Sequence, residues 1–98
     1  MFASVISRDG GAPWPACGMT SALWLERPIN DFAIRQLIAT QPGVMFEPLI
    51  NPQPSYSGDP YPHVVIWRGG RYLEDGHHRV IRAALAGQTL VKARYIRL

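Results

Sequence analysis

Prolines divide this 98-residue chain into two parts. Five of its nine prolines lie between Pro48 and Pro62, together with Gly58 and several small polar residues. Each proline lacks a backbone N–H, so no strand ladder or helix can continue through such a segment. We therefore expect residues 48–62 to form a long proline-rich loop, with regular structure on either side of it. Loops of this length are often lids or binding loops, and a merely tolerated insertion is the alternative.

Length and composition indicate one globular domain over residues 1–98. Hydrophobic residues make up 47% of the chain and charged residues 17%, which excludes a disordered protein. Cys17 is the only cysteine, so an intramolecular disulfide is excluded and a reducing compartment is indicated. A basic leader and a long apolar run are both absent, so we expect a cytoplasmic protein with no membrane partner. The net charge of +3 permits anionic partners without requiring them.

Before the proline-rich loop, the pattern predicts two strands and then a helix. A loosely alternating run over residues 1–7 and an apolar run over 22–25 predict the strands. Asn30 or Asp31 is suited to cap a helix that ends before Pro42. Three apolar residues at i, i+3 and i+4 spacing favour that helix, namely Ile34, Leu37 and Ile38. Residues 44–49 are expected to be extended.

After the loop, the signals are clearer. The β-branched run over residues 64–67 predicts a central strand, and Gly69–Gly70 predicts a hairpin turn into an antiparallel strand over 71–74. An alanine-rich helix is predicted for 77–86, followed by a final strand over 91–98. Together the two parts predict an α+β fold, a small mixed β-sheet with two main helices.

The start of the second helix carries the most informative residues. A helix N-terminus is partly positive and has free N–H groups, yet this one begins with His77, His78 and Arg79. An anion bound there would remove the conflict, and Gly76 has no Cβ to obstruct its approach. The alternative is a structural helix start, with Asp75 as the cap and the histidines facing outward.

The run from Tyr72 to Arg79, followed by an alanine pair, Gly87 and a strand, resembles the ParB-like nuclease domains of the ParB/sulfiredoxin superfamily. The resemblance extends over about residues 22–97 and leaves 1–21 as an unmatched N-terminal extension. It implies a nucleotide or another phosphate ligand held at the helix start, with Mg²⁺ arriving on the nucleotide and no metal bound by protein side chains alone. The implied binding residues are Asp75, Gly76, His77, His78 and Arg79.

The departures from the superfamily limit the implied activity. His77 stands where sulfiredoxins have their cysteine, so sulfinic acid reduction is not expected. If the domain is an enzyme, phosphoryl transfer or nuclease-type hydrolysis is implied, with Glu26 as the base and His77 as a second catalytic residue. Two alternatives stay open: a nucleic-acid-binding module that uses the same loop, or a non-catalytic accessory or phage-type protein with a protein partner.

Overall fold

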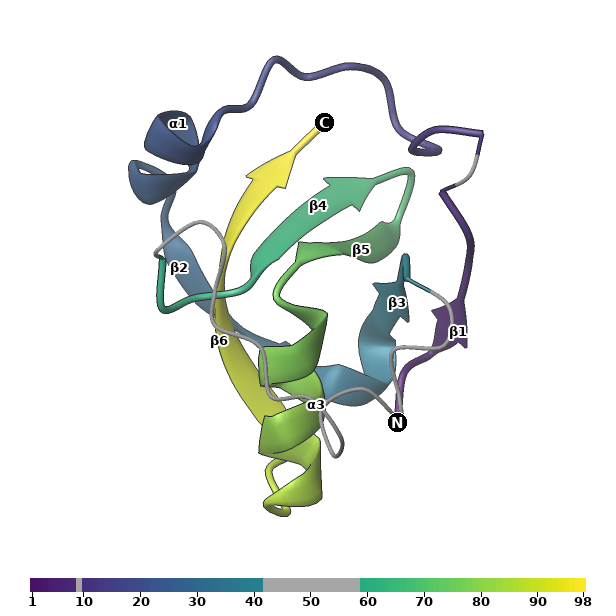
Figure 1. Ribbon diagram of the computed structural model, residues 1–98, viewed down its shortest axis with the longest axis vertical. Helices are drawn as coiled ribbons and strands as arrows, with labels where there is room; N and C mark the ends of the chain where they lie inside the picture. The colour runs from purple at the N-terminus through teal and green to yellow at the C-terminus, as the bar shows by residue number, and fades with distance from the viewer. Residues whose placement is uncertain (9, 42–58) are drawn as a thin grey trace.

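In the described part of the chain, the fold is built on one six-stranded mixed β-sheet with a helix packed on each face (Figure 1). The structure is a computed structural model, and it describes residues 1–8, 10–41 and 59–98. In spatial order the strands run β1-β3-β5-β4-β6-β2. Their bounds are Ser4–Val5 for β1, Ile29–Ala33 for β2, Leu37–Ala39 for β3, His63–Trp67 for β4, Gly70–Asp75 for β5 and Leu90–Arg97 for β6. The helices are α1 (Ser21–Leu25) and α3 (His77–Leu85), and this architecture confirms the predicted α+β class.

Strands β4 and β5 form the predicted hairpin, although the turn lies one residue earlier than expected. Trp67 pairs with Gly70, which leaves Arg68 and Gly69 as the two turn residues. Both have positive φ, 49° and 79°, as a two-residue turn matched to the twist of the strands requires. Gly70 therefore belongs to β5, and the prediction of a Gly69–Gly70 turn was wrong by one position.

Helix α3 occupies the predicted residues because its apolar side chains recur on one face. Val80 and Ile81 are fully buried there. Gly87, just beyond the helix, terminates it with a left-handed φ of 86°, and the Gln88 N–H then donates to the Ala83 carbonyl oxygen. Chain direction reverses at this point and leads into β6, as predicted for the last strand.

Two predictions for the first half were wrong. The apolar run at 22–25 is helix α1 and not a strand: the Thr20 hydroxyl accepts the Leu23 N–H at 3.2 Å and caps the helix. The predicted helix after Asn30 is instead β2, a 3-10 turn η1 (Ile34–Gln36) and β3. Edge strand β2 pairs antiparallel with β6, so sheet formation overrides the helical spacing of Ile34 and Leu37.

The two faces of the sheet have different coverings. On the first, which we call the α3 face, a wholly apolar core joins the sheet to α3. Its buried members are Phe32, Ile34, Leu37, Val64, Leu73, Val80, Val91 and Ala93. On the opposite α1 face, the N-terminal segment and α1 bring two tryptophans onto the strands. The buried members there are Trp14, Trp24, Val65 and Ile96.

Two sequence predictions lie outside the described residues. These are the extended piece at 44–49 and most of the proline-rich loop, of which the structure describes 59–62. In the described part of the chain, no helix combines the length and apolar character needed to cross a membrane.

Candidate functional site

The junction between β5 and α3 contains the residues predicted to bind an anion. Asp75 ends β5, and its Oδ1 accepts the N–H of Gly76 at 2.9 Å. Gly76 is the residue before the helix and has a φ of 89°. A Cβ at this position would lie 2.9 Å from the Cα of Pro62, so the left-handed backbone and the close approach both require glycine. Local geometry thus accounts for the Asp-Gly pair without any ligand.

His77 is buried, with 4% of its surface exposed. Its Nε2 accepts the backbone N–H of Thr40 at 2.9 Å, and the Thr40 hydroxyl donates to the Leu73 carbonyl oxygen at 2.7 Å. Burial, and after it the charge of Arg8, lowers the pKa of His77 from 6.5 to about 4. The imidazole is therefore neutral at pH 7 and joins the start of α3 to the end of β3.

The other predicted residues lie on two different helices. His78 is half-buried and Arg79 is exposed on the first turn of α3. Glu26 caps the C-terminus of α1, which packs on the face of the sheet opposite α3. The binding and catalytic roles of all these residues, and Mg²⁺ with a nucleotide as cofactor, stay predictions.

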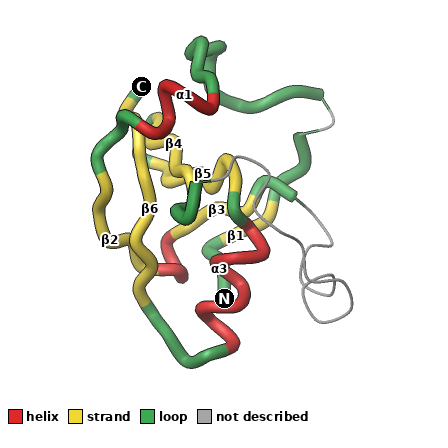
Figure 2. The backbone as a smooth tube through the Cα atoms, turned by 60° about the vertical axis from the view of Figure 1, so that its left-hand side comes forward, coloured by secondary structure: helices red, strands yellow, loops and turns green. Residues whose placement is uncertain are grey.

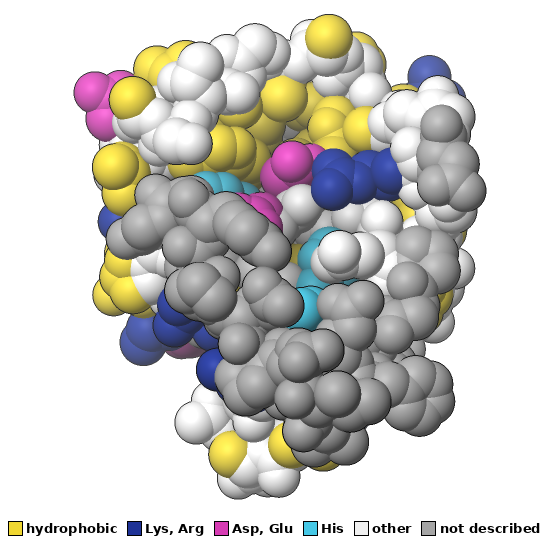
Figure 3. All heavy atoms as spheres, viewed as in Figure 1, with side chains coloured by type: hydrophobic (Ala, Val, Ile, Leu, Met, Phe, Trp, Pro, Cys, Tyr) yellow, Lys and Arg dark blue, Asp and Glu magenta, His cyan; other side chains and the backbone are white. Residues whose placement is uncertain are grey.

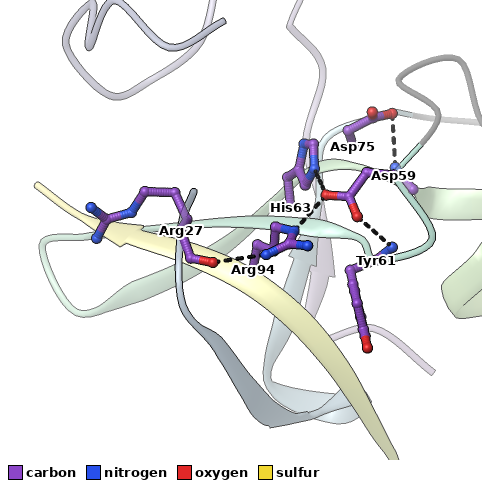
Figure 4. Close-up of polar contacts among 7 residues, drawn as sticks. Arg27, Asp59, Tyr61, His63, Asp75 and Arg94 are labelled. Atoms are coloured by element: carbon purple, nitrogen blue, oxygen red, sulfur yellow. Dashed lines mark hydrogen bonds and ion pairs between the residues drawn. The ribbon is translucent and has the colours of Figure 1, made fainter. Parts of the chain in front are cut away.

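A second polar group lies beside this junction, at residues for which no site was predicted. Asp59 is 1% exposed, and its Oδ2 lies 2.8 Å from His63 Nε2 and 2.7 Å from Arg94 Nε (Figure 4). Its Oδ1 accepts the Tyr61 N–H at 3.2 Å. Burial by itself raises the pKa of Asp59, but the hydrogen bonds from His63, Tyr61 and Arg94 outweigh it, so the pKa lies below its usual value. The carboxylate is ionised, and His63 Nε2 donates to it.

This Asp59 cluster joins three segments that are distant in sequence. The Trp24 ring of α1 stacks on the His63 ring, with centroids 4.4 Å apart and planes 5° from parallel. Arg94 on β6 donates from Nη1 to the Arg27 carbonyl oxygen at 2.9 Å, in the link between α1 and β2. Asp59 itself precedes β4. The cluster therefore fixes how α1 and the start of β2 sit against β4 and β6 (Figure 4).

The sequence signal for this cluster was weak. Neither Asp59 nor Arg94 was predicted to be a site residue. The useful signal was the spacing of Asp59 and His63 across two prolines, which stiffen the backbone between them. Arg94, the third member of the cluster, lies 31 residues after His63. Only the parallel pairing of β4 with β6 sets the two residues opposite each other.

A further ion pair completes the polar surface near the junction. Arg8 Nη1 lies 2.6 Å from Glu74 Oε2, and its guanidinium lies 5.9 Å from the centre of the Trp14 ring. Burial raises the pKa of Glu74 above its usual value, and Arg8 offsets this only in part. In Figure 3, acidic, basic and histidine side chains gather near the middle of the face in view. Among the described residues, no group of three or more His, Cys, Asp or Glu side chains is placed to hold a metal ion.

Taken together, these contacts define a small α+β protein whose buried polar groups are engaged with one another and with the backbone. The Antitoxin VapB-like family matches residues 3–98, nearly the whole chain. The chain therefore belongs to this family. No curated protein matches it, and no solved structure matches it.

Family membership corrects the earlier resemblance. The relation to the ParB/sulfiredoxin superfamily was wrong, and so was the inferred nucleotide- or phosphate-binding function with its nucleic-acid-binding and phage-type accessory alternatives. The motif misled because a strand, a glycine and a helix start follow one another here for structural reasons. Gly76 lies against Pro62, and the buried His77 satisfies a backbone N–H. Membership of an antitoxin family implies a protein partner, the cognate toxin.

Proposed function

We propose that this protein is an antitoxin that binds and neutralises a cognate VapC-type toxin. The observation that carries the proposal is the match of an antitoxin family to residues 3–98. The match spans both halves of the chain, so the six-stranded sheet as a whole is the antitoxin unit. Neutralisation then depends on direct contact between this fold and the toxin.

Surface composition supports a protein partner. Several large hydrophobic side chains of the described residues are exposed. Leu23 and Leu25 on α1 and Ile29 at the start of β2 are each more than 40% exposed, and they follow one another closely along the chain. The apolar cores of protein–protein interfaces are built from side chains of this kind.

The test is neutralisation of the cognate VapC-type toxin. Cells induced for the toxin alone are expected to stop growing, and cells that also express this chain are expected to grow. The purified pair is expected to elute as one complex from a size-exclusion column. A toxin from an unrelated pair serves as the control and is expected to elute separately. Absence of both growth rescue and co-elution would overturn the proposal.

A further inference from the structure

Strand β2 forms one edge of the sheet. It pairs with β6 on its inner side, and no described strand pairs with its outer side (Figure 2). The opposite edge is β1, which has only the two residues Ser4–Val5. An unpaired edge offers a row of backbone donors and acceptors to another chain, and longer edges offer more of them. Strand β2 is therefore the larger open edge of the described fold.

The pairing with β6 shows which backbone groups point outward. The Tyr95 N–H donates to the Pro28 carbonyl oxygen, and the Ile34 N–H donates to the Thr89 carbonyl oxygen. Hydrogen-bonded positions alternate in an antiparallel pair, so the even-numbered residues of β2 bond to β6. Ile29, Asp31 and Ala33 consequently direct their N–H and C=O groups away from the sheet.

The same three residues present their side chains on one face of the strand. Ile29 is 41% exposed. Asp31 is exposed and pairs with Lys92 at 3.2 Å. Ala33 borders a groove of about 480 Å³ whose lining is mixed, with apolar Ile34, Ala84 and Leu90 beside polar Arg35, Gln88 and Thr89. Along the edge the surface is thus apolar at Ile29, acidic at Asp31 and of mixed polarity at the groove beside Ala33.

We propose that the cognate toxin adds an extended segment to the outer edge of β2. This inference rests on the proposed function and names the surface that performs it. The backbone of the toxin segment pairs with the outward groups of Ile29, Asp31 and Ala33. Its chemistry follows from the cross-strand neighbours: a basic residue opposite Asp31 and an apolar residue opposite Ile29.

A second copy of this chain is a poorer occupant of the edge. Two β2 strands related by a two-fold axis use all three outward residues only when Asp31 lies opposite Asp31 of the other copy. Like charges directly opposite one another destabilise an antiparallel pair. A toxin strand with a basic residue at this position has the complementary charge.

The substitution Ala33→Pro tests the outer edge of β2 without disturbing the pairing of β2 with β6. Ala33 has a φ of −70°, which is the value that proline imposes, and its N–H faces outward and not toward β6. Ala33→Pro is expected to keep the urea midpoint of the free protein. Its affinity for the toxin, measured by calorimetry, is expected to fall about 100-fold, because a backbone donor is lost and the ring obstructs the incoming strand.

The matched control is Leu85→Ser, which changes an exposed apolar residue on α3 and is expected to leave affinity unchanged. Asp31→Arg provides a second variant that alters only an exposed side chain, and it is expected to weaken binding about tenfold by opposing the basic residue of the toxin. If Ala33→Pro does not fold, the toxin affinity of Asp31→Arg tests the proposal.

The outcomes separate the two proposals. Wild-type protein that does not bind the toxin overturns the proposed function itself. Wild-type binding that is equal in Ala33→Pro and Asp31→Arg overturns the edge proposal and leaves the antitoxin function intact. Sedimentation that shows a wild-type dimer abolished by Ala33→Pro, together with unchanged toxin affinity, assigns the edge to a second copy and also overturns the proposal.

Discussion

The two buried histidines stabilise the protein by opposite means. On the α3 side, His77 is neutral and accepts a hydrogen bond from the Thr40 backbone. On the α1 face, His63 stacks on Trp24 and donates to an ionised carboxylate, Asp59. Helix α3 is thus joined to the sheet by an apolar core and a neutral acceptor, whereas α1 is held by aromatic stacking and buried charge. The two helices are therefore expected to respond to different perturbations.

Removal of the Asp59 charge should have the largest effect. Asp59→Asn keeps the side-chain volume but leaves Arg94 without its buried counter-charge, and breaking such a pair costs about 3–5 kcal/mol of unfolding free energy. Urea denaturation measures this change. The matched control is Asp31→Asn, which breaks the exposed pair with Lys92 and should cost less than about 1 kcal/mol. Equal losses in the two variants would show that the Asp59 cluster does not hold the α1 face.

Acid should act first on the α3 side. The pKa of His77 is lowered from 6.5 to about 4 on folding, so the unfolded chain binds a proton between these values that the folded chain does not. The contribution of neutral His77 to the free energy of unfolding is complete above pH 6.5. It is lost as pH falls toward 4, and the total loss is about 3 kcal/mol. The pKa of Asp59 lies below 3.8, so its contribution persists through this range and is lost only in stronger acid.

The measurement for His77 is the urea midpoint as a function of pH. In His77→Gln, the decrease between pH 6.5 and 4 is expected to become shallow. His78→Gln is the control, since it alters the neighbouring half-buried histidine, and it should keep the wild-type slope. A slope that disappears in His78→Gln and persists in His77→Gln would contradict the assignment.

Gly76→Ala tests the point at which the two regions touch, and its effect should be smaller. The new Cβ meets the Cα of Pro62 at 2.9 Å and the backbone has positive φ, a strain of about 1–3 kcal/mol. Gly87→Ala is a matched control, because its φ of 86° is nearly the same but no atom lies within 4 Å of the added Cβ. Thermal unfolding should show a larger loss for Gly76→Ala, and equal losses would mean that contact with Pro62 contributes nothing.

The hairpin, α3 and β6 were predictable because local signals and packing agree there. Residues 64–67 form an apolar β-branched strand, and positive-φ glycines end both the hairpin turn and the helix. Before the proline-rich loop, local signals conflict with the sheet. Ile34 and Leu37 both reach the core, but from a 3-10 turn and a strand, so their spacing imitates a helix.

The candidate site was predictable only where it is local in sequence. Asp75, Gly76 and His77 are consecutive, so their position at the strand-to-helix junction followed from the residues. Asp59 and Arg94 are 35 residues apart, and parallel pairing of strands, which sequence spacing does not specify, brings them together. A buried pair of this kind becomes visible only with the fold.

Pairing of β2 with β6 also orders events during synthesis. Ile29 pairs with Arg94, so more than sixty residues separate the partners of this ladder. A ribosome releases β2 early and β6 after every other described strand, and contacts between such distant segments form slowly. Until β6 emerges, β2 has no neighbour to define its inner side, and hence no outer edge exists. The proposed toxin-binding surface therefore arises last, only when the sheet has been completed.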